Sequence, residues 1–363
     1  MDLKDEIMIA AEDIGIDIIG FAGSASKDFF VPIYEERKSE GWLVLLDSVD
    51  SKEWFSPEAH WDLCKSVVSI GVPYRWEEEC ETGGTQGLFA RVSRGVDYHR
   101  VLHEKIKQMM ERVKKSHPDI EYKAYVDNGP LSDRASAWAA GVGFYGKNGF
   151  IISPDYGSFV FLGQILLNRE LSEKSTPLES MCGHCDLCIN ACPADALKGP
   201  FQFDGNKCIA YLTQKKGILN RQERKAMGQS IYGCDICQDV CPFNKEAKLS
   251  KESKFKADCK DITPELEYIL NMDNKTYNEY FKGTSSGWRG KRTLQRNAVI
   301  LCGNILLENN FTLLLQCIHD QREEIRIHAM FSLLEYGARG EKIVKEHIQA
   351  ESCDFIDKFN RYR

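Results

Sequence analysis

Hydrophobic and polar positions alternate in three different ways along the chain. In residues 1–175, short apolar runs typical of strands, such as 64–74, are separated by helical patterns such as 98–116. Residues 176–248 are rich in Cys, Gly and Pro and show little periodicity, whereas helical periodicity dominates residues 249–363. The pattern predicts an α+β protein with three domains: an α/β domain, a domain organised by metal, and a helical domain.

The helical region carries a short repeat. Leu294–Ala298 and Ile325–Ala329 open similar apolar helices 31 residues apart. Each is followed by a second helix-like run, at 311–320 and 341–350. Two such units resemble a stack of HEAT-type helical hairpins, and chance pairing of helices is the alternative.

Length and composition describe a soluble globular protein. The chain has 363 residues, of which 43% are hydrophobic and 28% charged, enough for two or three domains. No stretch approaches the ~18 apolar residues of a membrane span. The acidic start also lacks the pattern of a signal peptide. We therefore expect a cytoplasmic monomer without membrane association. The net charge of −7 argues against a generally basic nucleic-acid coat.

The cysteines carry the most information. Of the 14, eight lie between Cys182 and Cys241. Thiols stay reduced in the cytoplasm, so such a dense group indicates metal binding rather than a disulfide framework. We interpret the other six as small buried hydrophobic residues. They are Cys64, Cys80, Cys259, Cys302, Cys317 and Cys353.

The spacing of the eight cysteines is that of a ferredoxin. It reads C-x2-C-x2-C-x3-C-P from Cys182, then a lone Cys208, then C-x2-C-x3-C-P from Cys234. In bacterial-type ferredoxins the fourth Cys of such a run ligates the other [4Fe–4S] cluster. This exchange predicts two clusters with four thiolates each. One set is Cys182, Cys185, Cys188 and Cys241, and the other is Cys192, Cys208, Cys234 and Cys237. Two structural zinc ions are the alternative, although zinc sites do not need the C-x3-C-P endings.

Seven segments carry a family resemblance. They are ARVSRGVDYH (90–99), VDNGPLSDRA (126–135), GVGFYGKNGFIISPDYGSFVFLGQ (141–164), CGHCDLCINACPADAL (182–197), KCIAYLTQKKG (207–217), IYGCDICQDVCPFNK (231–245) and SGWRGKRTLQRNA (286–298). Together, and in this order, they resemble epoxyqueuosine reductase.

The resemblance implies a cobalamin-dependent enzyme with two [4Fe–4S] clusters. Members of that family reduce an epoxide on the modified wobble base of tRNA, in the last step of queuosine synthesis. It also implies three domains: a nitroreductase-like corrinoid domain at 1–175, a ferredoxin-like domain at 176–248 and a HEAT-like, tRNA-binding domain at 249–363. An unidentified low-potential electron donor would feed the clusters.

The resemblance assigns the proton donor to Asp127. Reduction of an epoxide to an alkene needs two electrons and two protons. A carboxylic acid suits proton donation when apolar surroundings and a neighbouring anion raise its pKa. Asp133 is the rival, and the adjacent Arg134 favours an ion-paired role for it. The alternative for Asp127 is to cap a turn ahead of Asn128.

The corrin ring is broad and mainly apolar, so backbone groups and apolar side chains suit it. The resemblance gives Ala90, Asp127, Ile151 and Leu162 as corrin contacts, and ordinary core is the alternative for the apolar three. Asp97 and His99 match D-x-H-x-x-G, by which some corrinoid proteins ligate cobalt, only as far as the His. We therefore interpret His99 as structural and expect cobalt to lack a protein ligand.

Two segments of this acidic chain are locally basic, which suits a phosphate backbone. Between Glu279 and Glu308 there are five basic residues and no acidic one, and 215–225 has a net charge of +4. The residues we predict to bind tRNA are Lys215, Lys216, Trp288, Arg289, Lys291, Arg292 and Arg296. A solvated basic face is the alternative, and Trp288 either stacks on a base or anchors its loop.

Two other functional classes stay open on the sequence. A cytoplasmic reductive dehalogenase would share the corrinoid, but it would not need the basic GWRGKR segment. An electron-transfer ferredoxin fused to a helical scaffold would bind no corrinoid at all.

Overall fold

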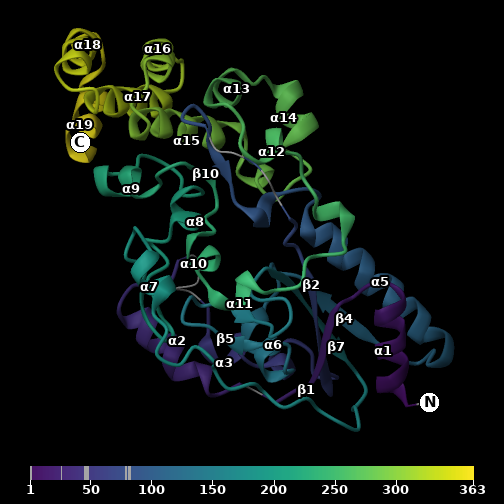
Figure 1. Ribbon diagram of the computed structural model, residues 1–363. Coiled ribbons are helices and arrows are strands. Elements are labelled where there is room, and N and C mark those ends of the chain that lie inside the picture. Colours follow the sequence, from purple (N-terminus) through teal and green to yellow (C-terminus); the bar gives the residue numbers. More distant parts are fainter. Residues whose placement is uncertain (1, 26, 45–48, 78–79, 81–82) are drawn as a thin grey trace. The chain divides into compact units, whose positions relative to one another are not determined.

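The computed structural model describes residues 2–25, 27–44, 49–77, 80 and 83–363 (Figure 1). The chain forms two compact units, each assembled from separated segments. The first unit comprises Met1–Glu77, Val96–Asn206 and Ile236–Lys256, and the second comprises Glu78–Gly95, Lys207–Asp235 and Ala257–Arg363. Both contain helices and strands, as the sequence predicts for an α+β protein.

A four-stranded antiparallel sheet is the centre of the first unit (Figure 1). Its order is β1 (Ile18–Gly23), β2 (Ser66–Pro73), β7 (Val160–Leu167) and β4 (Tyr122–Tyr125). All eight residues of β2 are buried. This explains why its sequence, SVVSIGVP, contains only apolar and small residues. The strands predicted from the apolar runs are thus confirmed.

The two faces of this sheet receive different helices. Ser69 lies opposite both Gly20 and Gln164, so these three residues share one face. On that face lies α6 (Asp133–Ala139), where the Gln164 amide nitrogen donates to the Asp133 carbonyl oxygen at 3.2 Å. The opposite face packs against α5 (Tyr98–Ser116). There, a Cβ on Gly163 would lie 3.2 Å from Ile106 of α5.

The remaining elements of the first unit are short apart from two helices near the N-terminus. The helices are α1 (Leu3–Asp13), α2 (Phe30–Ser39), α3 (Ser51–Trp54), α4 (Pro57–His60), α7 (Leu187–Ala191), α10 (Ile236–Asp239), α11 (Pro242–Lys245) and the 3-10 turn η2 (Ser253–Phe255). The strands form two small hairpins, β5 (Phe144–Tyr145) with β6 (Ile151–Ile152) and β8 (Leu197–Gly199) with β9 (Gln202–Phe203).

The second unit is mainly helical. Its one sheet within the described residues pairs β3 (Leu88–Phe89) with β10 (Ser230–Tyr232) in parallel. Its shorter helices are η1 (Arg91–Ser93), α8 (Ile209–Leu212), α9 (Arg221–Ala226), α12 (Cys259–Ile262), α13 (Leu266–Asn271), α14 (Asn274–Tyr280) and η3 (Gly287–Arg289). Five longer helices complete it: α15 (Lys291–Asn304), α16 (Glu308–Cys317), α17 (Glu323–Leu334), α18 (Ala338–Ile348) and α19 (Cys353–Tyr362).

The helical pattern of the last hundred residues is confirmed. The two segments that the sequence places 31 residues apart become α15 and α17, which pack against each other. Close approach requires a small residue at the crossing, where a Cβ on Gly303 would lie 2.6 Å from Ser332. The Ser332 hydroxyl donates to the Val299 carbonyl oxygen at 2.9 Å, which fixes the same crossing.

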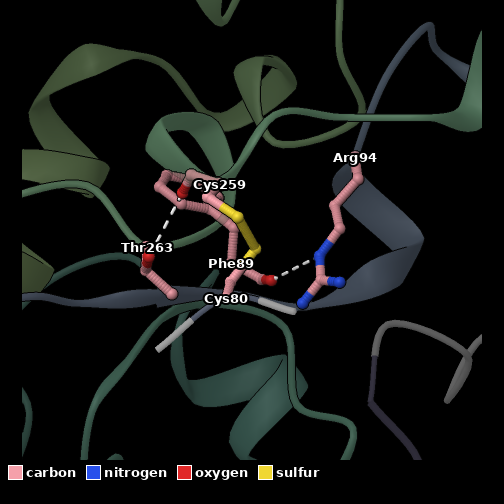
Figure 2. Close-up of a disulfide and its surroundings, with 5 residues drawn as sticks. All are labelled: Cys80, Phe89, Arg94, Cys259 and Thr263. Carbon is pink, nitrogen blue, oxygen red and sulfur yellow. Dashed lines mark hydrogen bonds between the residues drawn. A yellow bond between two sulfur atoms is a disulfide. The ribbon is translucent and has the colours of Figure 1, made fainter. Parts of the chain in front are cut away.

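The cysteines outside the dense group are not all buried hydrophobic residues, and that interpretation is wrong for three of them. Cys80 and Cys259 form a disulfide within the second unit, and Cys353 is exposed (Figure 2). The disulfide links residues 179 positions apart, a proximity that spacing does not reveal. Cys64 and Cys302 are buried as predicted, and Cys317 is partly buried.

Figure 2 shows how the disulfide region is held. The Thr263 hydroxyl donates to the Cys259 carbonyl oxygen at 3.1 Å, and the Arg94 Nε donates to the Phe89 carbonyl oxygen at 3.0 Å.

In the described part of the chain, no helix combines the length and apolar character of a membrane span.

Candidate functional site

The four cysteines of the first predicted cluster all lie in the first unit, and their thiols are near enough to affect one another's pKa. Cys182 and Cys185 lie on the loop that leads into α7, Cys188 lies in the first turn of α7, and Cys241 lies between α10 and α11. Burial, and then the negative charges of Cys182 and Cys241, raise the pKa of Cys188 to about 11. Four thiols that repel one another as thiolates suit a cationic iron centre, which removes that repulsion.

The surroundings of these thiols are apolar on one side and charged on the other. Cys241 and Cys182 pack with the aromatic and aliphatic side chains of Phe144 and Ile152. The Lys147 ammonium lies 2.7 Å from the Asp186 carboxylate, and its pKa is raised first by Asp186 and then by Cys182 and Cys185. Sequence reasoning did not single out Lys147, although it belongs to the quoted GKNG segment.

The second predicted set is divided between the units. Cys192 and Cys237 belong to the first unit, whereas Cys208 and Cys234 belong to the second. Cys192 accepts a hydrogen bond from the Ala196 backbone at 3.4 Å. Among the residues that the structure describes, no three His, Cys, Asp or Glu side chains lie close enough together to hold a single metal ion. The ligand set of the second cluster stays a prediction.

Asp127 follows the end of β4 in a strained turn. Its φ is 56°, in the left-handed region that Asp tolerates better than most residues. Its Oδ2 lies 3.5 Å from His99 Nε2, and 60% of its side chain is exposed. This hydrogen bond with His99 lowers the pKa of Asp127. The expectation that apolar surroundings raise the pKa of Asp127 is therefore wrong, because the imidazole of His99, which can carry a positive charge, lies beside the carboxylate.

His99 lies beside the candidate acid rather than in a purely structural position. Its Nδ1 is 2.7 Å from Asp97 Oδ1, and its Nε2 is 2.9 Å from the side-chain amide of Asn128. The hydrogen bond with Asp127 raises the pKa of His99, and the hydrogen bond with Asp97 raises it by a smaller amount. His99 and Asp127 thus form an acid–base couple, and the incomplete D-x-H motif was the available signal.

Asp133 has the environment that was expected for Asp127. Burial, and then the charge of Asp127, raise the pKa of Asp133 to about 7. Its Oδ1 is fully buried without a hydrogen-bond partner. Within the described residues, Arg134 forms no ion pair with Asp133, in contrast to the prediction. The Arg134 guanidinium instead donates to the Gly149 carbonyl oxygen at 2.7 Å.

The predicted corrin contacts are apolar side chains in both units. Ile151 on β6 is buried, and Leu162 on β7 is partly buried, both in the first unit. They belong to one apolar cluster with Tyr125, which precedes Asp127 by two residues. Ala90, in the second unit, is buried, and its backbone N–H donates to the Tyr232 carbonyl oxygen at 2.9 Å.

Trp288 anchors its loop, which is one of the two roles that the sequence left open. Its Nε1 donates to Gln214 at 3.0 Å and to the Tyr232 hydroxyl at 2.9 Å, which anchors the edge of the ring. The ring is nevertheless 60% exposed, and the Arg289 guanidinium lies 3.7 Å from its centre. An exposed aromatic surface beside a cation suits both a base and a phosphate.

Arg296 corrects the predicted tRNA-binding set. Its side chain is fully buried and donates to the backbone carbonyl oxygens of Lys215, Gly217 and Leu212. A buried guanidinium cannot contact a phosphate, so this prediction is wrong. Arg296 instead ties the 212–217 segment to α15.

The other basic residues remain nearer the surface. Lys216 is exposed, and Lys291 is partly buried. Lys215 pairs with Glu223, and Arg292 pairs with Glu324 at 2.6 Å. The exposed cationic surface therefore centres on Trp288, Arg289 and Arg292.

Arg296→Met is expected to destabilise the chain by about 3–5 kcal/mol. The substitution leaves buried carbonyl oxygens, and the facing Glu324 carboxylate, without their donor. Arg292→Ala is the matched control, because Arg292 pairs with the same Glu324 but is 55% exposed. We expect a change of at most about 1 kcal/mol there. Urea unfolding of the two variants checks this, and equal losses would contradict the structural role.

Comparison with known proteins defines the class first. Residues 181–244 match the family model of the 4Fe-4S double cluster binding domain. This match agrees with the spacing of the eight cysteines and sets the zinc alternative aside. The chain is an iron–sulfur protein that holds two [4Fe–4S] clusters.

Curated relatives then give the family. Residues 55–128 match the model of epoxyqueuosine reductase QueG, DUF1730. The chain is 36% identical to epoxyqueuosine reductase of Bacillus subtilis (strain 168) over 340 residues, which is 92% of this chain and 88% of that protein. It is 37% identical to the enzyme of Lactococcus garvieae (strain Lg2) over 305 residues, 83% of this chain and 87% of that one.

Solved structures agree over nearly the whole chain. A crystal structure of epoxyqueuosine reductase with a tRNA-Tyr epoxyqueuosine-modified tRNA stem loop has a TM-score of 0.92 at 34% identity, covering 99% of this chain and 97% of that one. The Bacillus subtilis structure with its catalytic loop swung out of the active site has a TM-score of 0.90 at 34% identity, with 98% of both chains covered. The chain belongs to the epoxyqueuosine reductase family and is an oxidoreductase.

Proposed function

We propose that this chain reduces epoxyqueuosine to queuosine at the wobble position of tRNA. The observation that carries the proposal is the likeness, over 99% of this chain, to an epoxyqueuosine reductase bound to an epoxyqueuosine-modified stem loop. The grouped first-cluster thiols and the Asp127–His99 couple supply what the reaction needs, a path for electrons and a proton source.

The proton source acts where the epoxide oxygen leaves. Asp127 is the residue we assign to protonate that oxygen, and His99, whose Nε2 lies 3.5 Å from Asp127 Oδ2, is the neighbour with which it shares the proton. The positive φ of Asp127 also fits an active-site residue, since strained backbone gathers at functional sites. When bound by the cysteines, the two clusters would supply single electrons to the reaction.

Cobalamin is the cofactor we assign to the catalytic domain, and the residues present fit it. Ile151 and Leu162 share an apolar cluster that reaches within two residues of Asp127, which suits a broad apolar ring. Both nitrogens of His99 already have partners, in keeping with a cobalt that takes no protein ligand. When bound, cobalamin supplies a strongly reducing, nucleophilic metal centre to the epoxide.

The domain assignment follows from the same proposal. Residues 1–175 would hold the corrinoid in a nitroreductase-like domain, 176–248 the clusters, and 249–363 the tRNA on HEAT-like helical repeats. The pairing of α15 with α17 supports the repeats. We further propose a cytoplasmic monomer that takes electrons from a low-potential donor.

The tRNA surface gives a prediction of its own. Arg289→Ala with Arg292→Ala is expected to weaken tRNA binding and to flatten its salt dependence by up to about one unit per lost phosphate contact. The matched control is Lys342→Ala with Lys345→Ala, two exposed cations of α18 that remove the same charge. Binding titrations at several salt concentrations measure the slopes. Superimposable curves for the arginine variant and wild type would contradict this surface.

Two measurements test the proposal as a whole. The visible spectrum of anaerobic protein reconstituted with cobalamin tests the cofactor, because a ferredoxin fused to a scaffold would not bind it. Nucleoside analysis of epoxyqueuosine-containing tRNA after incubation with the reduced protein tests the substrate. Loss of one oxygen atom from the wobble nucleoside supports the proposal, and an unchanged nucleoside contradicts it.

A further inference from the structure

Two segments of the second unit each carry one predicted ligand of the second cluster. Cys208 lies at the N-terminus of α8, where the Leu212 N–H donates to the Cys208 carbonyl oxygen at 2.9 Å. Cys234 follows β10, directly after Gly233. We call residues 208–214 the Cys208 arm and residues 230–234 the Cys234 arm. Thiolates that share a cluster need fixed positions, so something must hold the two arms together.

The buried side chain of Asn297 on α15 joins the two arms. Its amide nitrogen donates to the Thr213 carbonyl oxygen of the Cys208 arm at 2.7 Å and to the Ile231 carbonyl oxygen of the Cys234 arm at 2.7 Å. The Arg296 guanidinium donates to Asn297 Oδ1 at 2.7 Å, which fixes the orientation of the amide. Figure 1 shows α15 beside β10, the strand that leads to Cys234.

The buried hydroxyl of Thr213 makes a second link, next to a predicted ligand. The Gly233 N–H, immediately before Cys234, donates to Thr213 Oγ1 at 3.0 Å. The same hydroxyl donates to the Ala210 carbonyl oxygen of α8 at 3.0 Å. Thr213 therefore ties the backbone beside Cys234 to the helical turn that begins at Cys208.

Trp288 adds a third link at the exposed end of the arms. Its Nε1 donates to Gln214 of the Cys208 arm at 3.0 Å and to the Tyr232 hydroxyl of the Cys234 arm at 2.9 Å. The helical region thus reaches both arms from Trp288 as well as from Asn297. All of these contacts lie within the second unit.

We propose that Asn297 and Thr213 are positioning residues for the second cluster, which hold Cys208 and Cys234 at the separation that ligation requires. The inference rests on the proposed function, in which this cluster belongs to the electron path. Neither residue ligates iron, because each acts through the backbone of a ligand-bearing arm. Groups that orient metal ligands typically contribute about 10–100-fold to metal affinity. The helical region would therefore help to build the cluster besides binding tRNA.

Asn297→Asp tests the proposal on anaerobic, full-length protein that carries both clusters. The carboxylate can still pair with Arg296, but its oxygens repel the carbonyl oxygens of Thr213 and Ile231. About half of the iron should be lost to a chelator at least about tenfold faster than from wild type, and the rest at the wild-type rate. The electron paramagnetic resonance signal that remains should match that of Cys208→Ser.

Asn304→Asp is the matched control on the same helix. The Asn304 amide also donates to two backbone carbonyl oxygens, those of Arg224 and Gly228, which lie outside both arms. This variant should release iron as wild type does. The same accelerated loss in both variants, or equal loss of both clusters from Asn297→Asp, would mean general destabilisation and would overturn the proposal.

Thr213→Val and Thr213→Ser decide the question even if Asn297→Asp does not fold. Valine keeps the shape of the side chain but removes the acceptor for the Gly233 N–H, whereas serine keeps the hydroxyl. The valine variant should lose the second cluster selectively, and the serine variant should retain both. Wild-type iron release from the valine variant would overturn the positioning role of Thr213.

Failure of the proposed function would give a different result, because iron release is measured without tRNA or cobalamin. A chain that shows the selective losses but leaves epoxyqueuosine tRNA unchanged would overturn the proposed function and keep the positioning role. A chain that converts the tRNA, and whose Asn297→Asp and Thr213→Val variants hold both clusters as wild type does, would overturn the positioning role alone.

Discussion

Asp127→Asn is expected to lower turnover by about 10²–10⁴-fold, the usual contribution of a positioned acid. The amide keeps the size and hydrogen-bonding capacity of the carboxyl group but carries no acidic proton. Asp127 is largely exposed at the end of β4, so we expect the fold, the iron content and the bound cobalamin to be unchanged. Single-turnover rates on epoxyqueuosine tRNA, measured at saturating reductant, isolate the chemical step.

The controls for this variant separate proton donation from local structure. Asp155→Asn removes an exposed carboxylate elsewhere in the first unit and should turn over normally. His99→Gln removes the side chain that shares the proton with Asp127 and should shift the pH profile. Near-normal turnover of Asp127→Asn together with loss in Asp133→Asn would contradict the assignment and make Asp133 the direct donor.

Cys208→Ser is expected to remove one cluster and leave the other. Anaerobic wild-type protein should contain about eight irons, because the double-cluster domain provides two four-iron sites. The spacing assigns Cys208 to the second set, in place of the first member of the usual second run. Iron content should therefore fall to about four, and turnover should be lost because the electron path is broken.

Cys241→Ser is the matched variant for the first set. Cys241 lies among the thiols of Cys182, Cys185 and Cys188, so its loss should spare the second cluster. Electron paramagnetic resonance of the reduced variants should show a different remaining cluster in each. Equal loss of both signals in both variants would contradict the partition of ligands.

The two clusters could be predicted from sequence because the cysteine motif depends on local spacing. C-x2-C-x2-C-x3-C-P places thiols along one loop and short helix, and the exchange of the fourth Cys follows from ferredoxin chemistry. Four of these cysteines belong to the first unit, where their charges affect one another's pKa, and the ligand sets themselves stay predictions. Strands and long helices were predictable for the same reason, since their patterns are local.

Features set by long-range contacts could not be predicted. The burial of Arg296 depends on the 212–217 segment, which lies about 80 positions earlier in the chain. The Cys80–Cys259 disulfide depends on a separation of 179 residues. The lowered pKa of Asp127 could not be predicted because the sequence does not show that His99 lies 3.5 Å from its carboxylate. Charge and residue type alone do not predict how deeply a side chain is buried or which residues surround it.

Conversion of a defined tRNA tests the central claim most directly. Anaerobic protein with both clusters and cobalamin is incubated with a chemical reductant and a tRNA that carries epoxyqueuosine at the wobble position, and the digested nucleosides are analysed by mass. The account predicts queuosine, with wild type and not with Asp127→Asn, and none when cobalamin or reductant is left out. Unchanged epoxyqueuosine with the fully loaded wild-type protein would contradict it.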